Sequence, residues 1–248
     1  MRIREKMNRP LFYFFLALSF SCFALEVKYC EIADRELHAA NQRLLRDIVE
    51  EQLVLISPKA SSVEKGRILM RNISGIAARF IEKGFSPSAY SVPEGDPDSL
   101  LSFDCFALWE GGSIPATFLV YVWPSEEHAR AFNRTHPRNA YYGSIIHSHP
   151  ISCAFAVLDG TLSQENFALA SADRLDRIVR LIGEDLFHSL EGSVDDLKQP
   201  FIHRLYSKGG GKKPALSLHV YGLSTEEKVM ASFNETRALH SYTLETAR

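Results

Sequence analysis

The sequence of 248 residues has little cysteine, 4 residues in all, and almost no net charge, −2 at pH 7. So few cysteines exclude a disulfide-dense secreted scaffold, because such folds need many cross-links for their length. Without a positive field there is no electrostatic attraction to phosphates, so no nucleic-acid partner is expected. Internal repeats and low-complexity tracts are also absent. With 46% hydrophobic and 23% charged residues, the composition is that of a globular protein.

Residues 1–24 have the pattern of an export signal. Four basic residues among the first nine precede the apolar run 11–20, and small residues follow it up to Ala24. The run is shorter than the ~20 apolar residues that span a bilayer, which favours a signal over an anchor. Cleavage after Ala24 and lipidation at Cys22 are the two processing alternatives. We expect a periplasmic, secreted or membrane-anchored protein, with any membrane association through this segment, or a cytoplasmic one if the signal is inactive.

The remaining chain changes character near residue 100. Apolar residues recur at helical spacing over 31–55, and Ser61-Ser-Val-Glu64 has the spacing of a capping box before a second helix. Beyond residue 100, strand-like runs alternate with glycine turn signals. These runs are 103–109, 117–123, 153–158 and 215–221. The apolar residues of segment 165–190 fit the period of a helix as well as that of a strand.

These patterns predict an α+β fold, with N-terminal helices followed by a small β-barrel or sandwich. We expect a helical region and linker over 25–99, the barrel over 100–224, and a C-terminal extension over 225–248.

Histidines carry the clearest chemical signal. In Ile146-His147-Ser148-His149-Pro150, a strand would direct His147 and His149 to the same face. Two imidazoles at this spacing can bind one divalent metal ion, since neutral imidazole is a good ligand for iron, copper, nickel and zinc. Cys153 follows four residues later, and Gly160 occupies a turn.

Two further segments complete the pattern. His203 lies in Pro200-Phe-Ile-His-Arg, and the run 215–221 places Ser217, His219 and Tyr221 on one face of a strand. A buried polar row of this kind needs hydrogen-bond partners, and a functional site would supply them.

In this order, His147, His149, Cys153, His203 and the row from Ser217 to Tyr221 resemble the cysteine dioxygenase family of cupin thiol dioxygenases. Phe118-Leu-Val-Tyr-Val-Trp123 is similar to the strand that precedes the paired histidines there. The resemblance covers about half of the chain, from Phe103 to Tyr221, and implies a cupin-type jelly roll.

The resemblance also implies a chemistry. A ferrous ion, Fe(2+), would be bound by His147, His149 and His203, and the protein would be a monomer that oxidises a small thiol such as cysteine with O2. Three neutral ligands leave the full charge of the ion to attract a thiolate. Cys153 and Tyr221 would join in a thioether cross-link. Tyr221 would act as an acid or hydrogen-bond donor, oriented by His219 and Ser217.

The chain also departs from the family. The family's carboxylate-binding arginine is expected near Ser102–Phe106, where no arginine occurs. Arg130, Arg134 and Arg138, in the longer segment before the paired histidines, are the candidates to replace it. The sequence therefore leaves the substrate open.

Two other functions remain as alternatives. One is an exported cupin-like binding module without redox activity. The other is a zinc hydrolase, since His147-Ser-His-Pro150 also resembles the JAB/MPN isopeptidase motif. That motif requires serine at position 157 and aspartate at position 160, but this chain has Val157 and Gly160 there. The zinc ion would therefore lack its third protein ligand.

Overall fold

The computed structural model describes residues 27–92, 100–135, 143–144, 146–148, 152–170, 178–195, 202–208, 213–222, 240–241 and 243–244. The proposed export signal of residues 1–24 lies outside these residues, as do His149 and Arg138. No helix within the described ranges is both long enough and apolar enough to cross a membrane.

Three helices precede the β-sheets. They are α1 (Arg35–Leu55), α2 (Ser62–Arg71) and α3 (Ile73–Glu82). The Asp34 side chain accepts from the backbone N–H groups of the first turn of α1, and the Ser61 side chain accepts from that of Glu64 in α2. These caps satisfy N–H groups that have no partner inside the helix.

Short elements connect the helices to the sheets. They are β1 (Val27–Tyr29), β2 (Glu31–Ile32), the 3-10 helix η1 (Pro87–Ala89), β3 (Tyr90–Ser91) and β4 (Leu100–Ser102). β1 pairs with β4 in parallel, and β2 pairs with β3 antiparallel.

Two larger sheets form the body. The first has the strand order β11-β8-β13-β6-β5, from Gly192–Asp195, Ser152–Asp159, Ala215–Gly222, Ala116–Trp123 and Asp104–Glu110. The second has the order β14-β7-β12-β9-β10-β15, from His240–Ser241, His147–Ser148, Ile202–Ser207, Leu162–Leu169, Ile178–Phe187 and Thr243–Leu244. One further helix, α4 (Glu126–Thr135), lies between β6 and β7 in the chain.

The strand pairing is that of a jelly roll. From β6 to β13, each strand pairs antiparallel with its counterpart from the other end of the series: β6 with β13, β7 with β12, β8 with β11 and β9 with β10. A nested hairpin of eight strands that rolls into two facing sheets is the double-sheet jelly roll, the architecture to which cupins belong. The prediction of a jelly roll is therefore confirmed. Closure into a barrel is not seen, since no strand pair in the described part of the chain joins the two sheets.

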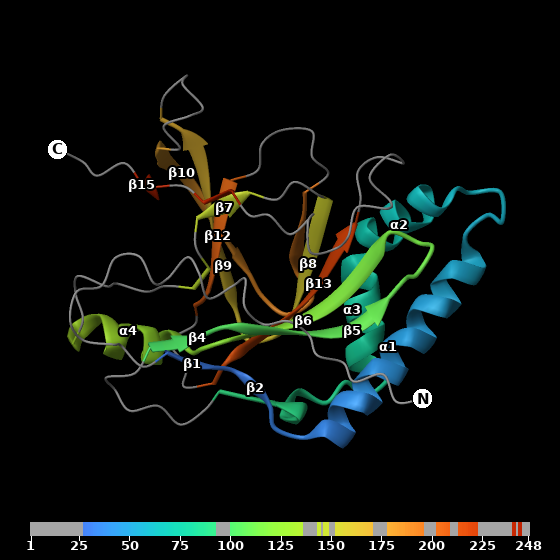
Figure 1. The fold of residues 1–248 in the computed structure, drawn as a ribbon, viewed down its shortest axis with the longest axis horizontal. Helices are drawn as coiled ribbons and strands as arrows, with labels where there is room; N and C mark the ends of the chain where they lie inside the picture. Colours follow the sequence, from blue (N-terminus) through green and yellow to red (C-terminus); the bar gives the residue numbers. More distant parts are fainter. Residues whose placement is uncertain are drawn as a thin grey trace, which may run out of the picture.

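The helices cover one face of the first sheet. Figure 1 shows α1, α2 and α3 against β5, β6, β8 and β13, while β7, β9, β10 and β12 lie on the other side of these strands. Outward-facing residues of the sheet, such as Val120, Ala156 and Leu218, share one buried apolar cluster with Leu45, Ile76 and Phe80 of the helices. Burial of this apolar area is the main contribution to the stability of the contact.

The opposite face of the first sheet meets the second sheet. Trp123, Phe155 and Val157 of the first sheet form a second apolar cluster with Leu162 and Leu205 of the second. The space between the sheets is therefore a packed interior, and any side chain that shares this face points into it.

Two parts of the chain that the sequence left less defined contribute strands to the second sheet. Residues 240–241 and 243–244 pair with β7 and β10, so the expected C-terminal extension contributes strands to the second sheet. The segment 165–190, which fitted either period, provides most of β9 and β10.

Candidate metal and thiol site

Two of the predicted histidines meet in the interior. His147 on β7 and His203 on β12 are direct partners across the second sheet, and both are buried. Their Nε2 atoms lie 3.1 Å apart, and the rings cross at 84°. Side chains that are 56 positions apart in sequence therefore present the same ring atom to one point.

This geometry fits two nitrogen ligands of one cation. Histidine nitrogens lie about 2.0–2.1 Å from a bound zinc ion, and two such ligands at a right angle are separated by about 3 Å. Without a metal ion, one ring must carry its proton on Nε2 and donate it to the other ring. A cation would displace that proton and bind both nitrogens.

The third expected ligand, His149, lies outside the described residues, so its position relative to the pair is not given. Within the described ranges, no three or more His, Cys, Asp or Glu side chains come together as a metal site. The three-histidine site therefore stays a prediction, of which the structure brings two members together.

The polar row of β13 shares one face of the strand, as its alternation predicts, and this face points into the interior. Leu216, Leu218 and Val220 belong to the cluster under the helices, so Ser217, His219 and Tyr221 face the second sheet. Ser217 and His219 are buried, and the Ser217 hydroxyl lies 2.9 Å from Nε2 of His219.

Trp123 completes this network. Its indole Nε1–H donates to the Ser217 hydroxyl oxygen at 2.8 Å. Because that oxygen accepts from the indole, the hydroxyl hydrogen is available for Nε2 of a neutral His219. The ring of His219 also stacks on Phe155, with centroids 5.3 Å apart. The imidazole is thus held by hydrogen bonding and packing together.

His219 is neutral at physiological pH. Burial, and secondarily the charge of nearby His147, lowers its pKa from 6.5 to about 3. His147 belongs to the second sheet and His219 to the first. The influence of His147 on the pKa of His219 is therefore an electrostatic interaction across the interior.

The Tyr221 hydroxyl has a partner that the sequence did not reveal. It lies 3.0 Å from the hydroxyl of Tyr121 on the neighbouring strand β6. The ring of Tyr221 stacks beside His219, with centroids 6.2 Å apart. Tyr121 itself packs against His219, with centroids 4.2 Å apart. Period-2 alternation of β6 put Tyr121 on the face of Trp123, but only strand pairing shows that this face meets Tyr221.

Cys153 is the direct cross-strand partner of Tyr221. Partners on adjacent strands have Cβ atoms about 4.5–5.5 Å apart and project to the same face. The two residues of the expected cross-link are therefore neighbours on the interior face. Cys105 takes the equivalent place opposite Tyr121 on β5.

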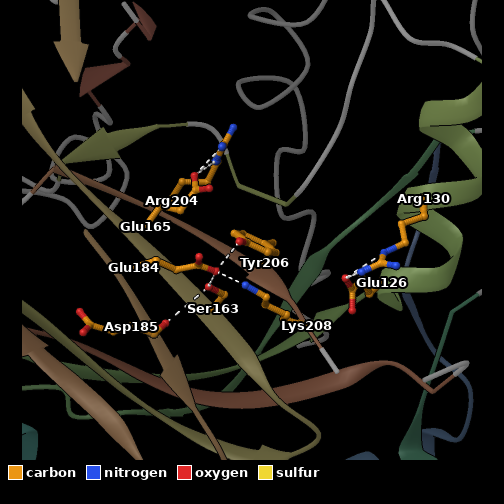
Figure 2. Close-up of polar contacts among 9 residues, drawn as sticks. All are labelled: Glu126, Arg130, Ser163, Glu165, Glu184, Asp185, Arg204, Tyr206 and Lys208. Atoms are coloured by element: carbon orange, nitrogen blue, oxygen red, sulfur yellow. Dashed lines mark hydrogen bonds and ion pairs between the residues drawn. The ribbon is translucent and has the colours of Figure 1, made fainter. Parts of the chain in front are cut away.

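The arginines proposed to bind a carboxylate do not point to this site where the structure describes them. Arg130 on α4 pairs with Glu126, and its side chain is 66% exposed (Figure 2). Arg134 is exposed as well. Arg204, which follows His203, points to the outer face of the second sheet and pairs with Glu165 (Figure 2).

A second polar cluster lies on that outer face. Glu184 accepts hydrogen bonds from Ser163, Tyr206 and Lys208 (Figure 2). These contacts, with that of Lys208 the largest, lower the pKa of Glu184 to about 2. By strand alternation the cluster is separated from the histidine pair by the sheet itself, so it is a surface network.

Sequence reasoning missed three further polar residues near the histidine pair. Asn166 on β9 is the direct partner of His203, and Gln164 precedes it by two positions on the same face. Gln164 donates to Asn166, and Asn166 donates to Asp185 on β10. The polar run Ser163-Gln-Glu-Asn166 is the part of the sequence that could have indicated them. Its residues alternate between the two faces of β9, so the sequence alone does not tell which of them point to the interior.

The zinc-hydrolase alternative finds no support in this geometry. Val157 is part of the apolar interior cluster. Gly160 has φ of +80° in the turn between β8 and β9, a conformation that favours glycine. The nearby Asp159 is exposed.

Comparisons with known proteins give structural similarity alone. No family model matches the chain, and no match was found among curated proteins. Among solved structures, it is similar to a recombinant oxalate oxidase in complex with glycolate at 14% identity and a TM-score of 0.34, over 54% of this chain and 57% of that one. It is also similar to the Cnp3 cupin domain of Schizosaccharomyces pombe at 10% identity and a TM-score of 0.35, over 58% and 77% of the two chains.

A third similar structure is the hydroquinone 1,2-dioxygenase PnpCD in complex with Cd2+ and 4-hydroxybenzonitrile, at 10% identity and a TM-score of 0.30, over 47% of this chain and 61% of that one. TM-scores this low carry no argument about activity. The fold assignment rests on the strand order, and the function rests on the site.

Proposed function

We propose that this protein is a non-haem iron thiol dioxygenase, which oxidises a small thiol to its sulfinic acid with O2. The observation that carries the proposal is the pair of buried Nε2 atoms of His147 and His203, 3.1 Å apart. The overall reaction is balanced, since both oxygen atoms of O2 are added to the sulfur and the thiol hydrogen ends on the acid.

His147 and His203 would hold the iron, with His149 as the third ligand. When bound, Fe(2+) supplies a site that attracts a thiolate and activates O2. All three proposed ligands are neutral, so they leave the charge of the ion uncompensated for the anionic substrate. Neutral imidazole is a suitable ligand for iron, which agrees with this choice of metal.

The first sheet would supply the groups on the opposite side of the interior from these ligands. Trp123 and Ser217 hold His219 in one orientation, and Tyr121 holds the Tyr221 hydroxyl. This phenol can donate a hydrogen bond or a proton to an atom bound between the sheets. The apolar residues below, including Leu162 and Phe155, exclude water from that space.

A binding module without redox activity is the alternative. It is favoured by the absence of arginine from Ser102–Phe106, because that residue would hold a substrate carboxylate in the resembling family.

One experiment separates the candidates. Full-length protein is loaded with metal under anaerobic conditions, its iron and zinc contents are measured, and O2 uptake is followed with small thiols. A dioxygenase retains iron and consumes one O2 per thiol. Iron without thiol-dependent uptake indicates the binding module, and retention of zinc alone refutes the proposal.

A further inference from the structure

The two C-terminal strands lie at opposite edges of the second sheet. β14 pairs with β7, where Ser241 is opposite His147, and β15 pairs with β10, where Thr243 is opposite Ile178. In the strand order β14 is the first strand and β15 the last, although they follow each other directly along the chain. One short segment of the chain is therefore joined to both edges.

This connection requires the second sheet to curl. In a flat sheet of this order, β14 and β15 would be separated by about 24 Å, since neighbouring strands lie about 4.8 Å apart. Ser241 and Thr243 are two positions apart, and such a segment spans at most about 7 Å. The edges at β7 and β10 must therefore approach each other at this end. Figure 1 shows β15 beside β10, with β7 close by in this view.

An apolar cluster lies at the same end of the second sheet. Its buried members are Ile146, Phe167, Val179 and Ile202. By strand alternation these side chains face away from the first sheet, because His147 and His203 face towards it. The helices α1, α2 and α3 lie beyond the first sheet (Figure 1). The burial of this cluster therefore needs a cover on the outer face of the second sheet.

The cluster lies directly behind the histidine pair. Ile146 precedes His147 in the chain, and Ile202 precedes His203. Adjacent residues of a strand point to opposite faces, so each histidine has one isoleucine of the cluster on the other side of the sheet. A movement of β7 that separates the two Nε2 atoms would also separate the two isoleucines. Packing of the cluster and convergence of the histidines therefore depend on the same placement of β7.

β7 itself has little other support. In the part of the chain that the structure describes, it pairs with β12 at one position, His147 with His203. β14 pairs with both residues of β7, since His240 is opposite Ser148 and Ser241 is opposite His147. The C-terminal strand thus contributes more partners to β7 than β12 does.

We propose that β14 and β15 form a C-terminal clasp, which covers the apolar cluster and thereby positions His147 for metal binding. The metal in this inference rests on the proposed function, whereas the clasp rests on strand pairing and burial. Residues of the clasp are positioning residues, because they act through β7. Metal binding and clasp closure should then stabilise each other, since coupling between two sites is reciprocal.

A charge placed in the clasp tests this inference. Leu244 is opposite Val179, which is 0% exposed. An unpaired carboxylate at this position is incompatible with a buried cluster. We expect Leu244→Asp in the full-length protein to weaken Fe(2+) binding by about tenfold or more, measured by anaerobic calorimetry. Val54→Asp makes a similar change at a side chain on α1 that is 83% exposed, and it should leave the affinity unchanged. Wild-type affinity in Leu244→Asp would overturn the clasp.

A reversible lock provides a second test, should Leu244→Asp fail to fold. Ile178 and Thr243 are direct partners, and the spacing of adjacent strands, about 4.8 Å, is within the range that a disulfide bridges. In the double variant Ile178→Cys with Thr243→Cys, the oxidised protein should release Fe(2+) to a chelator several-fold more slowly than the reduced protein. Wild-type protein should release it at one rate with and without reductant. Equal rates for the two forms of the double variant would contradict the proposal.

Hydrogen exchange separates the clasp from the metal. In metal-free protein, the backbone amides of residues 146–148 should exchange faster in Leu244→Asp than in the wild type. Unchanged exchange there would refute the clasp whatever the metal does. Faster exchange together with no Fe(2+) binding by the wild type would instead support the clasp and refute the proposed iron chemistry.

Discussion

The rings of His147 and His203 meet almost at right angles, with their Nε2 atoms 3.1 Å apart. Neither strand determines this contact alone. It requires β7 and β12 to pair with these two residues directly opposite each other. A slip of one position would turn one of the rings to the outer face of the sheet.

Removal of one ring should therefore release the metal. We expect His203→Ala to lose iron retention, with iron content after loading and desalting measured by mass spectrometry. His188→Ala changes a histidine near the end of β10 and serves as the control, so its iron content should match that of the wild type. Unchanged iron in His203→Ala would remove this residue from the site.

The pairing of Cys153 with Tyr221 predicts a cross-link in the metal-loaded protein under air. A thioether between the sulfur and the phenol ring removes about two hydrogen masses, and the compact product should migrate faster in a denaturing gel, as expected for the resembling family. Cys153→Ser should abolish the fast band, whereas Cys105→Ser should keep it. A fast band in Cys153→Ser would assign the product to another residue.

The low pKa of His219 predicts a pH-dependent stability. The unfolded chain binds a proton at this residue below pH 6.5, while the folded chain resists protonation down to about pH 3. Stability therefore falls as the pH decreases through this window, by up to about 1.4 kcal/mol per pH unit. In His219→Gln, the free energy of unfolding in urea should therefore decrease less steeply as the pH falls from 6 to 4. The same slope in both proteins would show that His219 is protonated easily in the folded state.

Ser217 couples Trp123 to His219, so its loss should cost more than one hydrogen bond. Ser217→Ala leaves the buried indole N–H without its acceptor, and we expect about 1–3 kcal/mol of destabilisation in urea unfolding. Trp123→Phe removes the donor. The double variant should therefore be more stable than the sum of the single changes predicts. Strict additivity would mean that the two side chains do not interact.

Gly160 lies in the turn that joins β8 of the first sheet to β9 of the second. Gly84, which follows α3, serves as the control position for a glycine-to-alanine change. Both have positive φ, but a Cβ at Gly160 would lie 3.0 Å from the Cβ of Ala215, whereas a Cβ at Gly84 would meet nothing within 4 Å. Gly84→Ala should cost about 1 kcal/mol of backbone strain, and Gly160→Ala should cost clearly more. Equal losses in thermal unfolding would show that β13 moves to accommodate the methyl group.

Aromatic and β-branched runs between turn signals were enough to predict the strands that contain Trp123, Cys153 and Tyr221, and alternation was enough to place Ser217 and His219 on one shared face. These strands are covered by helices on one face and by the other sheet on the opposite face, so β6 and β8 are almost continuously apolar and only β13 alternates between apolar and polar residues. The nested pairing that brings His203 to His147 could be expected only from the family resemblance, because period alone does not determine which strands pair.

The contacts that sequence could not reveal are those between distant polar residues. Tyr121 and Gln164 look like ordinary strand residues until the sheets are assembled. β10 was ambiguous because most of its residues are exposed, so it lacks a buried stripe that would mark its period.

The two halves of the candidate site belong to different sheets. His147, His203 and Gln164 lie on one, while Ser217, His219 and Tyr221 lie on the other, and no strand pairing in the described chain connects the two. The distance between the histidine pair and the Tyr221 phenol is therefore determined by the volume of the apolar side chains packed between the sheets, such as Leu162, Leu205 and Phe155. A smaller or larger side chain at one of these apolar positions should change the distance between Tyr221 and the histidine pair, without altering any residue of the candidate site.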